Sequence, residues 1–439
     1  MLSDSKHTYE PHSIIKNINL KIVILQDDLY PEAKGGASMI VFELAKKYLL
    51  RGHRVSVITA TQNKKMVGRT SLEGLDIYRL FSDYHERWRA YLSLYNPTMV
   101  TCVKKILNAI KPDIVHAHNI HKHISYYALR CSKKTGAKVF LTAHDAMLFH
   151  YGKFYEFIDS TILECPQKIN YKISAWQQLK TFRKRYNPFR NIIIRHYLRY
   201  LDKIFSVSHA LEDALNQNGI TNTLVIYNGI DLDAWRVSDN SIAKFKDKYQ
   251  LGGKKIILFG GQLSPAKGAE ETIRALRLIV RQVPNATLLV LGNIDSNYSR
   301  TIGRLMGHLR IMQRAIFTGW LTGDELKAAY WACDIAVFPS LCLDTFGMVN
   351  IEAMAAGKPV IGTCFGGTPE IIVNGMTGYV INPYDINKFA EKAIDLLINA
   401  DKSYRFGEAG QKRVKEVFDI DIQVDKYLEL FTPTPNMHE

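Results

Sequence analysis

Residues 344–370 read Asp-Thr-Phe-Gly-Met-Val-Asn-Ile-Glu-Ala-Met-Ala-Ala-Gly-Lys-Pro-Val-Ile-Gly-Thr-Cys-Phe-Gly-Gly-Thr-Pro-Glu. Asp344 and Glu352 stand eight positions apart, a little over two helical turns. We expect a helix beyond Gly347, with Asp344 in the loop before it and Glu352 on its body. Such carboxylates accept hydrogen bonds from paired sugar hydroxyls, while the free amides of a first helical turn face an anion. Gly347 lets the backbone come close to a ligand, because glycine has no side chain. The stretch therefore predicts a site for a sugar linked to a phosphate.

The same segment resembles the Glu-x7-Glu signature of the retaining family-4 glycosyltransferases, usually Glu-Pro-Phe-Gly-Leu-Val-x-x-Glu-Ala-Met-Ala-x-Gly-x-Pro-Val. Here Asp344 replaces the first Glu and Thr345 replaces the Pro. The positions that keep the register are Phe346, Gly347, Ala353, Met354, Gly357, Pro359, Gly366, Gly367 and Glu370. An ordinary amphipathic helix with a Gly-Lys-Pro stop would account for two carboxylates alone, and the further matches favour the resemblance.

The resemblance implies a role for each carboxylate. Asp344 is expected to hold hydroxyls of the donor sugar, and Glu352 is expected to hold the ribose of its nucleotide. Donor contacts are also expected at the residues between them, Phe346, Gly347, Met348 and Val349.

A glycine-rich loop at residues 260–268 follows an apolar run and reads Gly-Gly-Gln-Leu-Ser-Pro-Ala-Lys-Gly. The family typically carries Gly-Arg here and Lys-Gly five residues later, two cations that grip the donor diphosphate. Lys267 fits the second position and is expected to stabilise the charge of the leaving group. Gln262 replaces the arginine, and a glutamine donates hydrogen bonds without bringing charge. Either the site works with one cation, or a base from elsewhere compensates.

Two positions in the N-terminal half are further candidates. Gly35 and Gly36 precede a helical pattern, so their amides could face a diphosphate, although a tight turn would explain them equally well. The resemblance implies donor or acceptor contact there. His144 follows an apolar strand, at the place where the family has a histidine in its cleft. The resemblance implies that this histidine positions the donor sugar, and the neighbouring Asp145 would orient the histidine. The alternative for His144 is a cap on the strand.

Three other residues have less decisive contexts. Trp320 falls where the family's backbone meets the nucleobase, and could be a base platform or a core residue. His116 and His118 have a spacing that could suit a metal, but no third ligand candidate lies near them in the sequence. No metal and no other cofactor is therefore expected.

Short apolar strands alternate with helices in both halves of the chain, which predicts an α/β protein with two parallel sheets. Predicted strands include residues 20–26, 54–60, 138–143, 254–260, 286–291 and 378–381, and predicted helices include 38–50, 99–110 and 269–282. Two Rossmann-like domains facing across a cleft resemble the GT-B architecture, in which the final helix crosses back to the N-terminal domain. The expected boundaries are an N-terminal acceptor-binding domain (1–236), a linker (237–251), a nucleotide-sugar-binding domain (252–410) and the returning helix (411–439).

The net charge of +15 is concentrated in the first half: residues 1–200 carry 32 Lys and Arg against 15 Asp and Glu. Between Glu164 and Asp202 there are nine bases and no acid, interleaved with aromatic and aliphatic residues. This pattern suits an anionic membrane surface, where each base contributes about 1 kcal/mol. A solvated helix face is the alternative, and nucleic acid is not expected because no binding motif accompanies the bases.

No apolar run approaches the roughly 20 residues of a spanning helix, and the six cysteines are scattered without a Cys-x-x-Cys pair. These features predict a reduced cytoplasmic protein, with peripheral membrane association left open. Together with the resemblance, they predict a retaining hexosyltransferase that moves a hexose from a nucleoside-diphosphate sugar to an acceptor hydroxyl, on a sugar or lipid-linked sugar, in surface polysaccharide or glycolipid synthesis. The departures at Gln262 and Asp344 keep an alternative open: a non-catalytic, nucleotide-sugar-binding partner subunit of a glycosyltransferase complex.

Overall fold

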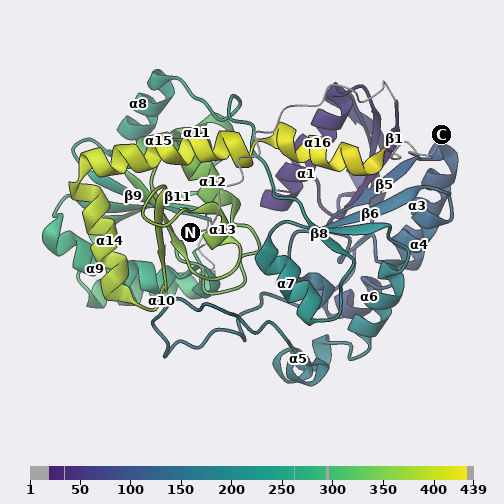
Figure 1. Ribbon diagram of the computed structural model, residues 1–439, viewed down its shortest axis with the longest axis horizontal. Helices are drawn as coiled ribbons and strands as arrows, with labels where there is room; N and C mark the ends of the chain where they lie inside the picture. Colours follow the sequence, from purple (N-terminus) through teal and green to yellow (C-terminus); the bar gives the residue numbers. More distant parts are fainter. Residues whose placement is uncertain (1–18, 34, 262, 293–295, 433–439) are drawn as a thin grey trace, which may run out of the picture.

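The structure, a computed structural model, describes residues 19–33, 35–261, 263–292 and 296–432. Two α/β domains lie side by side, and the helices at the end of the chain run across both (Figure 1). Within the described residues, no helix is both long and apolar enough to cross a membrane.

The N-terminal domain is built on an eight-stranded sheet with the order β3-β4-β2-β1-β5-β6-β7-β8. Its strands are β1 (Lys21–Gln26), β2 (Arg54–Thr61), β3 (Gly68–Leu72), β4 (Leu75–Phe81), β5 (Ile114–Ala117), β6 (Lys138–Ala143), β7 (Lys203–Ser206) and β8 (Thr223–Val225). Its helices are α1 (Gly36–Leu50), α2 (Arg89–Leu92), α3 (Pro97–Ile110), α4 (Tyr127–Lys133), α5 (Ala175–Phe182), α6 (Arg190–Leu198) and α7 (His209–Gln217). All pairings are parallel except that of β3 with β4. Buried apolar runs such as that of β1 explain why these strands occupy the middle of the domain.

The C-terminal domain is built on a six-stranded parallel sheet with the order β11-β10-β9-β12-β13-β14. Its strands are β9 (Lys255–Gly260), β10 (Ala286–Leu291), β11 (Ala315–Gly319), β12 (Ile335–Phe338), β13 (Val360–Thr363) and β14 (Gly378–Ile381). Its helices are α8 (Asp239–Lys248), α9 (Ala269–Gln282), α10 (Ser296–His308), α11 (Gly323–Ala332), α12 (Met348–Ala355), α13 (Thr368–Ile371), α14 (Ile386–Ile398) and α15 (Ala400–Val417). The two sheets, parallel except for the β3–β4 pair, confirm the predicted α/β class.

The end of the chain crosses back to the N-terminal domain, as expected. Helix α15 lies along the C-terminal domain, and α16 (Ile420–Phe431) continues onto the other domain (Figure 1). The apolar residues of α16 join the core of the N-terminal domain, and they are Ile420, Val424, Tyr427, Leu428 and Phe431. The crossing is fixed where the Gly229 amide donates to Gln423 Oε1 at 2.8 Å and the Ile230 amide donates to the Phe418 carbonyl at 2.8 Å.

Strand β3 and helix α8 are among the elements that were not expected from the sequence. Strand β3 pairs antiparallel with β4 at the sheet edge, and its exposed Gly-Arg-Thr-Ser-Leu sequence has no apolar run to signal a strand. Helix α8 lies within the segment expected to be the linker, begins after the Ser238 cap and packs against α11. Its single buried residue, Phe245, gives a weak helical pattern. The predicted domain boundaries themselves stay predictions.

A long irregular segment, residues 151–174, leaves the N-terminal domain and contacts the C-terminal domain; we call it the arm. The carbonyl of Phe154 accepts a hydrogen bond from the Leu343 amide at 2.7 Å. Farther along, Asn382 Nδ2 donates to the Ile162 carbonyl at 2.8 Å and to the Glu164 carbonyl at 3.2 Å. The arm therefore bridges the two domains at two separate places.

The basic stretch that follows lies mostly on the surface, on and around α5 and α6. Its exposed bases are Lys168, Lys172, Lys180, Arg183, Lys184, Arg185, Arg195 and Arg199. Arg190 is different, because its side chain is fully buried and its guanidinium lies 5.6 Å from the Tyr151 ring centroid. Arg190, one of the nine bases of the predicted membrane-facing stretch, is therefore not available to a membrane surface and packs inside the protein.

Candidate active site

The predicted site residues from both halves of the chain meet where the two domains face each other. The hydroxyl of Thr345 donates to the carbonyl of His144 at 2.5 Å. The hydroxyl of Ser208 donates in turn to the Thr345 carbonyl, also at 2.5 Å. A Cβ built on Gly36, at the first turn of α1, would lie 3.9 Å from Met348 Cγ at the first turn of α12. The glycine loop of one domain thus faces the signature segment of the other.

Helix α12 begins at Met348, immediately after the residue that the sequence singled out as a close-approach glycine. Gly347 is the N-cap of α12 with φ 75°, a left-handed conformation that favours glycine. A Cβ at this position would lie 2.5 Å from Asn350 Nδ2, which donates to the Gly347 carbonyl. The first N–H groups of the helix have no partner within it, so this helix end can bind an anion.

Lys267 and Asp344 form an ion pair at the edge of the site. Lys267 Nζ lies 2.7 Å from Asp344 Oδ2, and the hydroxyl of Ser340 donates to the same oxygen at 3.0 Å. The two charged side chains are 31% and 13% exposed. Burial raises the pKa of Asp344, but Lys267 and Ser340 outweigh this and hold it below the usual value of an aspartate. Asp344 is therefore a carboxylate, and Lys267 is its counter-ion.

Glu352 lies on the body of α12 and is bound by a residue that sequence reasoning missed. The phenol of Tyr330, on α11, donates to Glu352 Oε2 at 2.6 Å. Burial raises the pKa of Glu352, and the hydrogen bond from Tyr330 offsets only part of that rise. A Cβ on Gly260, at the end of β9, would lie 3.0 Å from the Tyr330 oxygen and 3.4 Å from Val349 Cγ1. No sequence signal identified Tyr330, because it lies in a helix remote from the signature.

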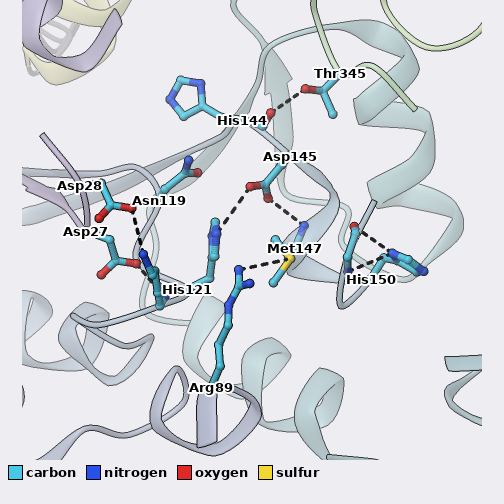
Figure 2. A network of polar contacts seen from close by, with 12 residues as sticks. Asp27, Asp28, Arg89, Asn119, His121, His144, Asp145, Met147, His150 and Thr345 are labelled. Atoms are coloured by element: carbon cyan, nitrogen blue, oxygen red, sulfur yellow. Dashed lines mark hydrogen bonds and ion pairs between the residues drawn. The ribbon is translucent and has the colours of Figure 1, made fainter. Parts of the chain in front are cut away.

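His144 follows β6 and points away from its neighbour Asp145 (Figure 2). Its Nε2 lies 3.0 Å from Nδ1 of His118. Asp145 instead approaches Nε2 of His121 at 3.6 Å and accepts from the Met147 amide at 2.8 Å. The prediction that Asp145 orients His144 is wrong; His118 orients it. Burial lowers the pKa of His144 to about 4, so its imidazole is neutral at pH 7.

The remaining predicted donor-contact residues are spread more widely. Phe346 is buried, with ring centroids 6.0 Å from Tyr227 and 5.7 Å from Phe418, so its side chain anchors the segment. Donor contact at this position stays a prediction. Trp320 follows β11 and is 42% exposed, and its role as a base platform stays a prediction. Gln262 lies outside the described residues. Gly35 is the N-cap of α1, which begins two residues before the predicted start.

His116 lies deeper than His118, in the core behind the site. Its Nε2 lies 2.8 Å from the hydroxyl of Thr142, which in turn contacts the hydroxyl of Tyr427 on α16 at 3.1 Å. Among the described residues, no group of three or more His, Cys, Asp or Glu side chains is arranged to hold a metal ion.

The N-terminal side of the site is hollowed by two adjoining pockets that share Asp28 and Ala33. They lie at the carboxyl ends of β1, β2 and β5, beside Gly35. Their charged and polar lining includes Asp28, Glu32, Arg79, Asn119, His121 and Lys122. Arg79 forms an ion pair with Glu32, in which Arg79 Nη2 lies 2.7 Å from Glu32 Oε1. A lining of this kind can hydrogen-bond to a hydroxyl-rich ligand.

Comparison with solved structures identifies the fold. Sucrose-phosphate synthase from Thermosynechococcus elongatus superposes with a TM-score of 0.74 at 19% identity, covering 94% of this chain and 98% of the synthase. The Anabaena protein HepE, solved with UDP and glucose, superposes with a TM-score of 0.71 at 20% identity. The match covers 94% of this chain and 99% of HepE. These likenesses, together with the two facing sheets and the returning helix, define a glycosyltransferase fold of the GT-B class, as predicted.

Sequence comparison places the chain within a family of that class. Residues 241–413 match the family described as Glycosyl transferases group 1, and residues 34–234 match Glycosyltransferase Family 4. The chain therefore belongs to the family-4 glycosyltransferases, also called group 1.

Individual relatives differ in how much they share with the chain. N-acetyl-alpha-D-glucosaminyl L-malate synthase of Bacillus anthracis is 26% identical over 411 residues, which is 92% of this chain and 94% of the synthase. A putative glycosyltransferase of Bacillus subtilis is 34% identical over 187 residues, 39% of this chain and 45% of the relative. The chain spans about half the length of this relative and of similar mycobacterial mannosyltransferases.

Proposed function

We propose that the protein is a retaining hexosyltransferase, which transfers a hexose from a nucleoside-diphosphate sugar to an acceptor hydroxyl without a metal. The observation that carries this proposal is the ion pair between Lys267 and Asp344, whose side chains are 2.7 Å apart. Asp344 lies on the segment that leads into the N-terminus of α12. This arrangement offers a cation and free amides to a diphosphate, and a carboxylate to the sugar that it carries. Glu352, farther along the helix, can accept the hydroxyls of a ribose.

The chemistry follows from where charge develops. As the bond between the sugar and the diphosphate breaks, negative charge accumulates on the phosphate oxygen, and Lys267 with the first amides of α12 stabilises it. His144, neutral and held by His118, can donate a hydrogen bond to a sugar hydroxyl. The acceptor hydroxyl attacks from the face that the diphosphate leaves, and its proton passes to the departing phosphate oxygen. The configuration at the sugar carbon is then retained.

The names of similar proteins suggest which substrates to try first. HepE was solved with UDP and glucose, and the mycobacterial relatives are named as GDP-mannose-dependent enzymes that act on a phosphatidylinositol mannoside. We therefore favour an acceptor that is a sugar or lipid-linked sugar of a surface polysaccharide or glycolipid, held by the pockets beside Gly35.

A donor screen tests the proposed activity. We expect the purified protein to cleave or transfer from one of the UDP-, GDP- or ADP-hexoses, and we expect proton NMR of the product to show the anomeric configuration of the donor. Release of nucleoside diphosphate is the primary measurement. Binding of a sugar nucleotide without any turnover would instead support a non-catalytic partner subunit, and an inverted product would contradict the retaining mechanism.

We further propose that the exposed basic stretch docks on an anionic membrane, at its cytoplasmic face. Large apolar side chains stand exposed among the bases: Trp176 at 64%, Phe189 at 65% and Ile192 at 59%. Lys184 and Arg185 lie on the short turn between α5 and α6. Apolar side chains that insert at the interface, together with bases that contact anionic headgroups, are typical of peripheral proteins.

Vesicle sedimentation tests this docking. We expect the protein to bind phosphatidylcholine vesicles that contain phosphatidylglycerol, and the double variant Lys184→Glu/Arg185→Glu to bind at least about tenfold more weakly, since each base contributes about 1 kcal/mol. Lys412→Glu, a similar change at an exposed lysine of α15, is the control and should bind like the wild type. Equal binding to vesicles with and without phosphatidylglycerol would contradict the proposal.

A further inference from the structure

The backbone on both sides of Lys153, a lysine of the arm, is hydrogen-bonded to other elements. On one side, the Tyr151 amide donates to Gln178 Oε1 at 3.0 Å. On the other, Phe154 is buried and its carbonyl accepts from the Leu343 amide at 2.7 Å. Residue 343 directly precedes Asp344, so this hydrogen bond places the backbone of Lys153 next to the signature segment of the other domain. The side chain of Lys153 itself is exposed.

Electrostatic interactions link the ammonium of Lys153 to both charges of the ion pair. Partial burial lowers the pKa of Lys153, the ammonium of Lys267 lowers it further, and Asp344 acts in the opposite direction. Lys153 is likewise among the groups that hold the pKa of Asp344 low. The ammonium groups of Lys153 and Lys267 therefore both act on one carboxylate, Asp344, and the charges of these three groups sum to a positive value.

An excess of one cation beside a helix N-terminus favours a ligand that carries more than one negative charge. Among the described residues of the C-terminal domain, Lys267 is the cation that pairs with Asp344, and the chain has a glutamine at position 262, where the family resemblance leads us to expect an arginine. Lys153 differs from both because it comes from the N-terminal domain, on an arm that is hydrogen-bonded to the C-terminal domain.

We propose that Lys153 is the second cation of the diphosphate site, delivered across the cleft by the arm to the terminal phosphate of a nucleoside diphosphate. The proposal rests on the proposed function and adds a residue to it. It also makes the arm a part of the donor site, since the hydrogen bond between Phe154 and Leu343 sets where the ammonium lies. A lysine acts here as a point charge, without the planar two-point grip of an arginine.

Calorimetric titration of the full chain with UDP, GDP and ADP, and with the three corresponding monophosphates, tests the proposal. We expect Lys153→Met to weaken binding of the preferred diphosphate at least tenfold and to leave binding of its monophosphate within twofold. Lys153→Arg should keep most of the affinity for the diphosphate. Lys172→Met is the matched control, because Lys172 is an exposed lysine on the same arm next to Tyr171, whose amide donates to Gln217 Oε1 in the N-terminal domain.

The separate readouts distinguish the possible failures. Unchanged diphosphate affinity in Lys153→Met would overturn this inference alone and leave the proposed function standing. An equal loss for monophosphate and diphosphate would also overturn it, because the lysine would then support the shape of the site and not the terminal phosphate. Failure of the wild-type protein to bind any of the three diphosphates would overturn the inference and the proposed function together.

Discussion

Lys267→Ala is expected to lower kcat roughly a hundredfold, the usual cost of removing one group that stabilises developing charge in a transition state. The ammonium is held 2.7 Å from Asp344 and is mostly buried, so water does not readily replace it. The loss should fall on kcat more than on KM, since the charge of the leaving group grows as the bond breaks. Steady-state kinetics with the preferred donor measures both quantities.

The two carboxylates should behave in parallel. Asp344→Ala and Glu352→Ala are each expected to lose more than tenfold in kcat, because one binds the sugar and the other the ribose. The control is Lys255→Ala, which removes a lysine of the same domain that lies 3.4 Å from a different carboxylate, Asp334. Thermal unfolding separates loss of activity from loss of fold. Near-normal turnover in Asp344→Ala, Glu352→Ala and Lys267→Ala would refute the assignment of these residues to the donor site.

Gly366→Ala is expected to damage both the fold and the activity. Gly366 has φ 68°, and a Cβ there would overlap the carbonyl oxygen of Asp344 and lie 2.9 Å from its amide nitrogen. The left-handed backbone alone costs a non-glycine residue about 1–2 kcal/mol, and the overlap must in addition push the Asp344 backbone aside. We expect a loss of stability above 2 kcal/mol, which is roughly the upper end of the backbone cost, and a fall in kcat of more than tenfold.

A glycine with the same backbone conformation but open surroundings isolates the steric effect. Gly253 also has φ 68°, and a Cβ built on it has no neighbour within 4 Å. Gly253→Ala should therefore lose only the backbone contribution and keep its kcat. Chemical denaturation gives the free energy of unfolding for both variants. If Gly366→Ala were no less stable and no less active than Gly253→Ala, the position of Asp344 would not depend on contact with Gly366.

The regular elements of the fold were predictable because their signals are local. Strand β10 and helix α9 were predicted to the residue, since one is a continuous apolar run and the other a periodic apolar pattern. Strand β3 and helix α8 were not predicted, because almost all of their side chains are exposed or only partly buried and so leave little apolar pattern to detect.

The candidate site was predictable where its residues belong to a local motif. The spacing of Asp344 and Glu352 on one segment could be seen directly, whereas Tyr330, which donates to Glu352, comes from a different helix and belongs to no motif. At the end of β6, the adjacency of His144 and Asp145 in the sequence led to the wrong prediction that the two side chains interact. Successive side chains of an extended segment point to opposite sides, so His144 turns to His118 while Asp145 turns to His121.

The most direct test of the central claim is a crystal structure of the protein with its preferred nucleoside diphosphate. The account predicts that the terminal phosphate lies within hydrogen-bond distance of Lys267 Nζ and of the first amides of α12, with the ribose hydroxyls on Glu352. A nucleotide bound elsewhere, with Lys267 and the start of α12 making no contact to phosphate, would contradict it.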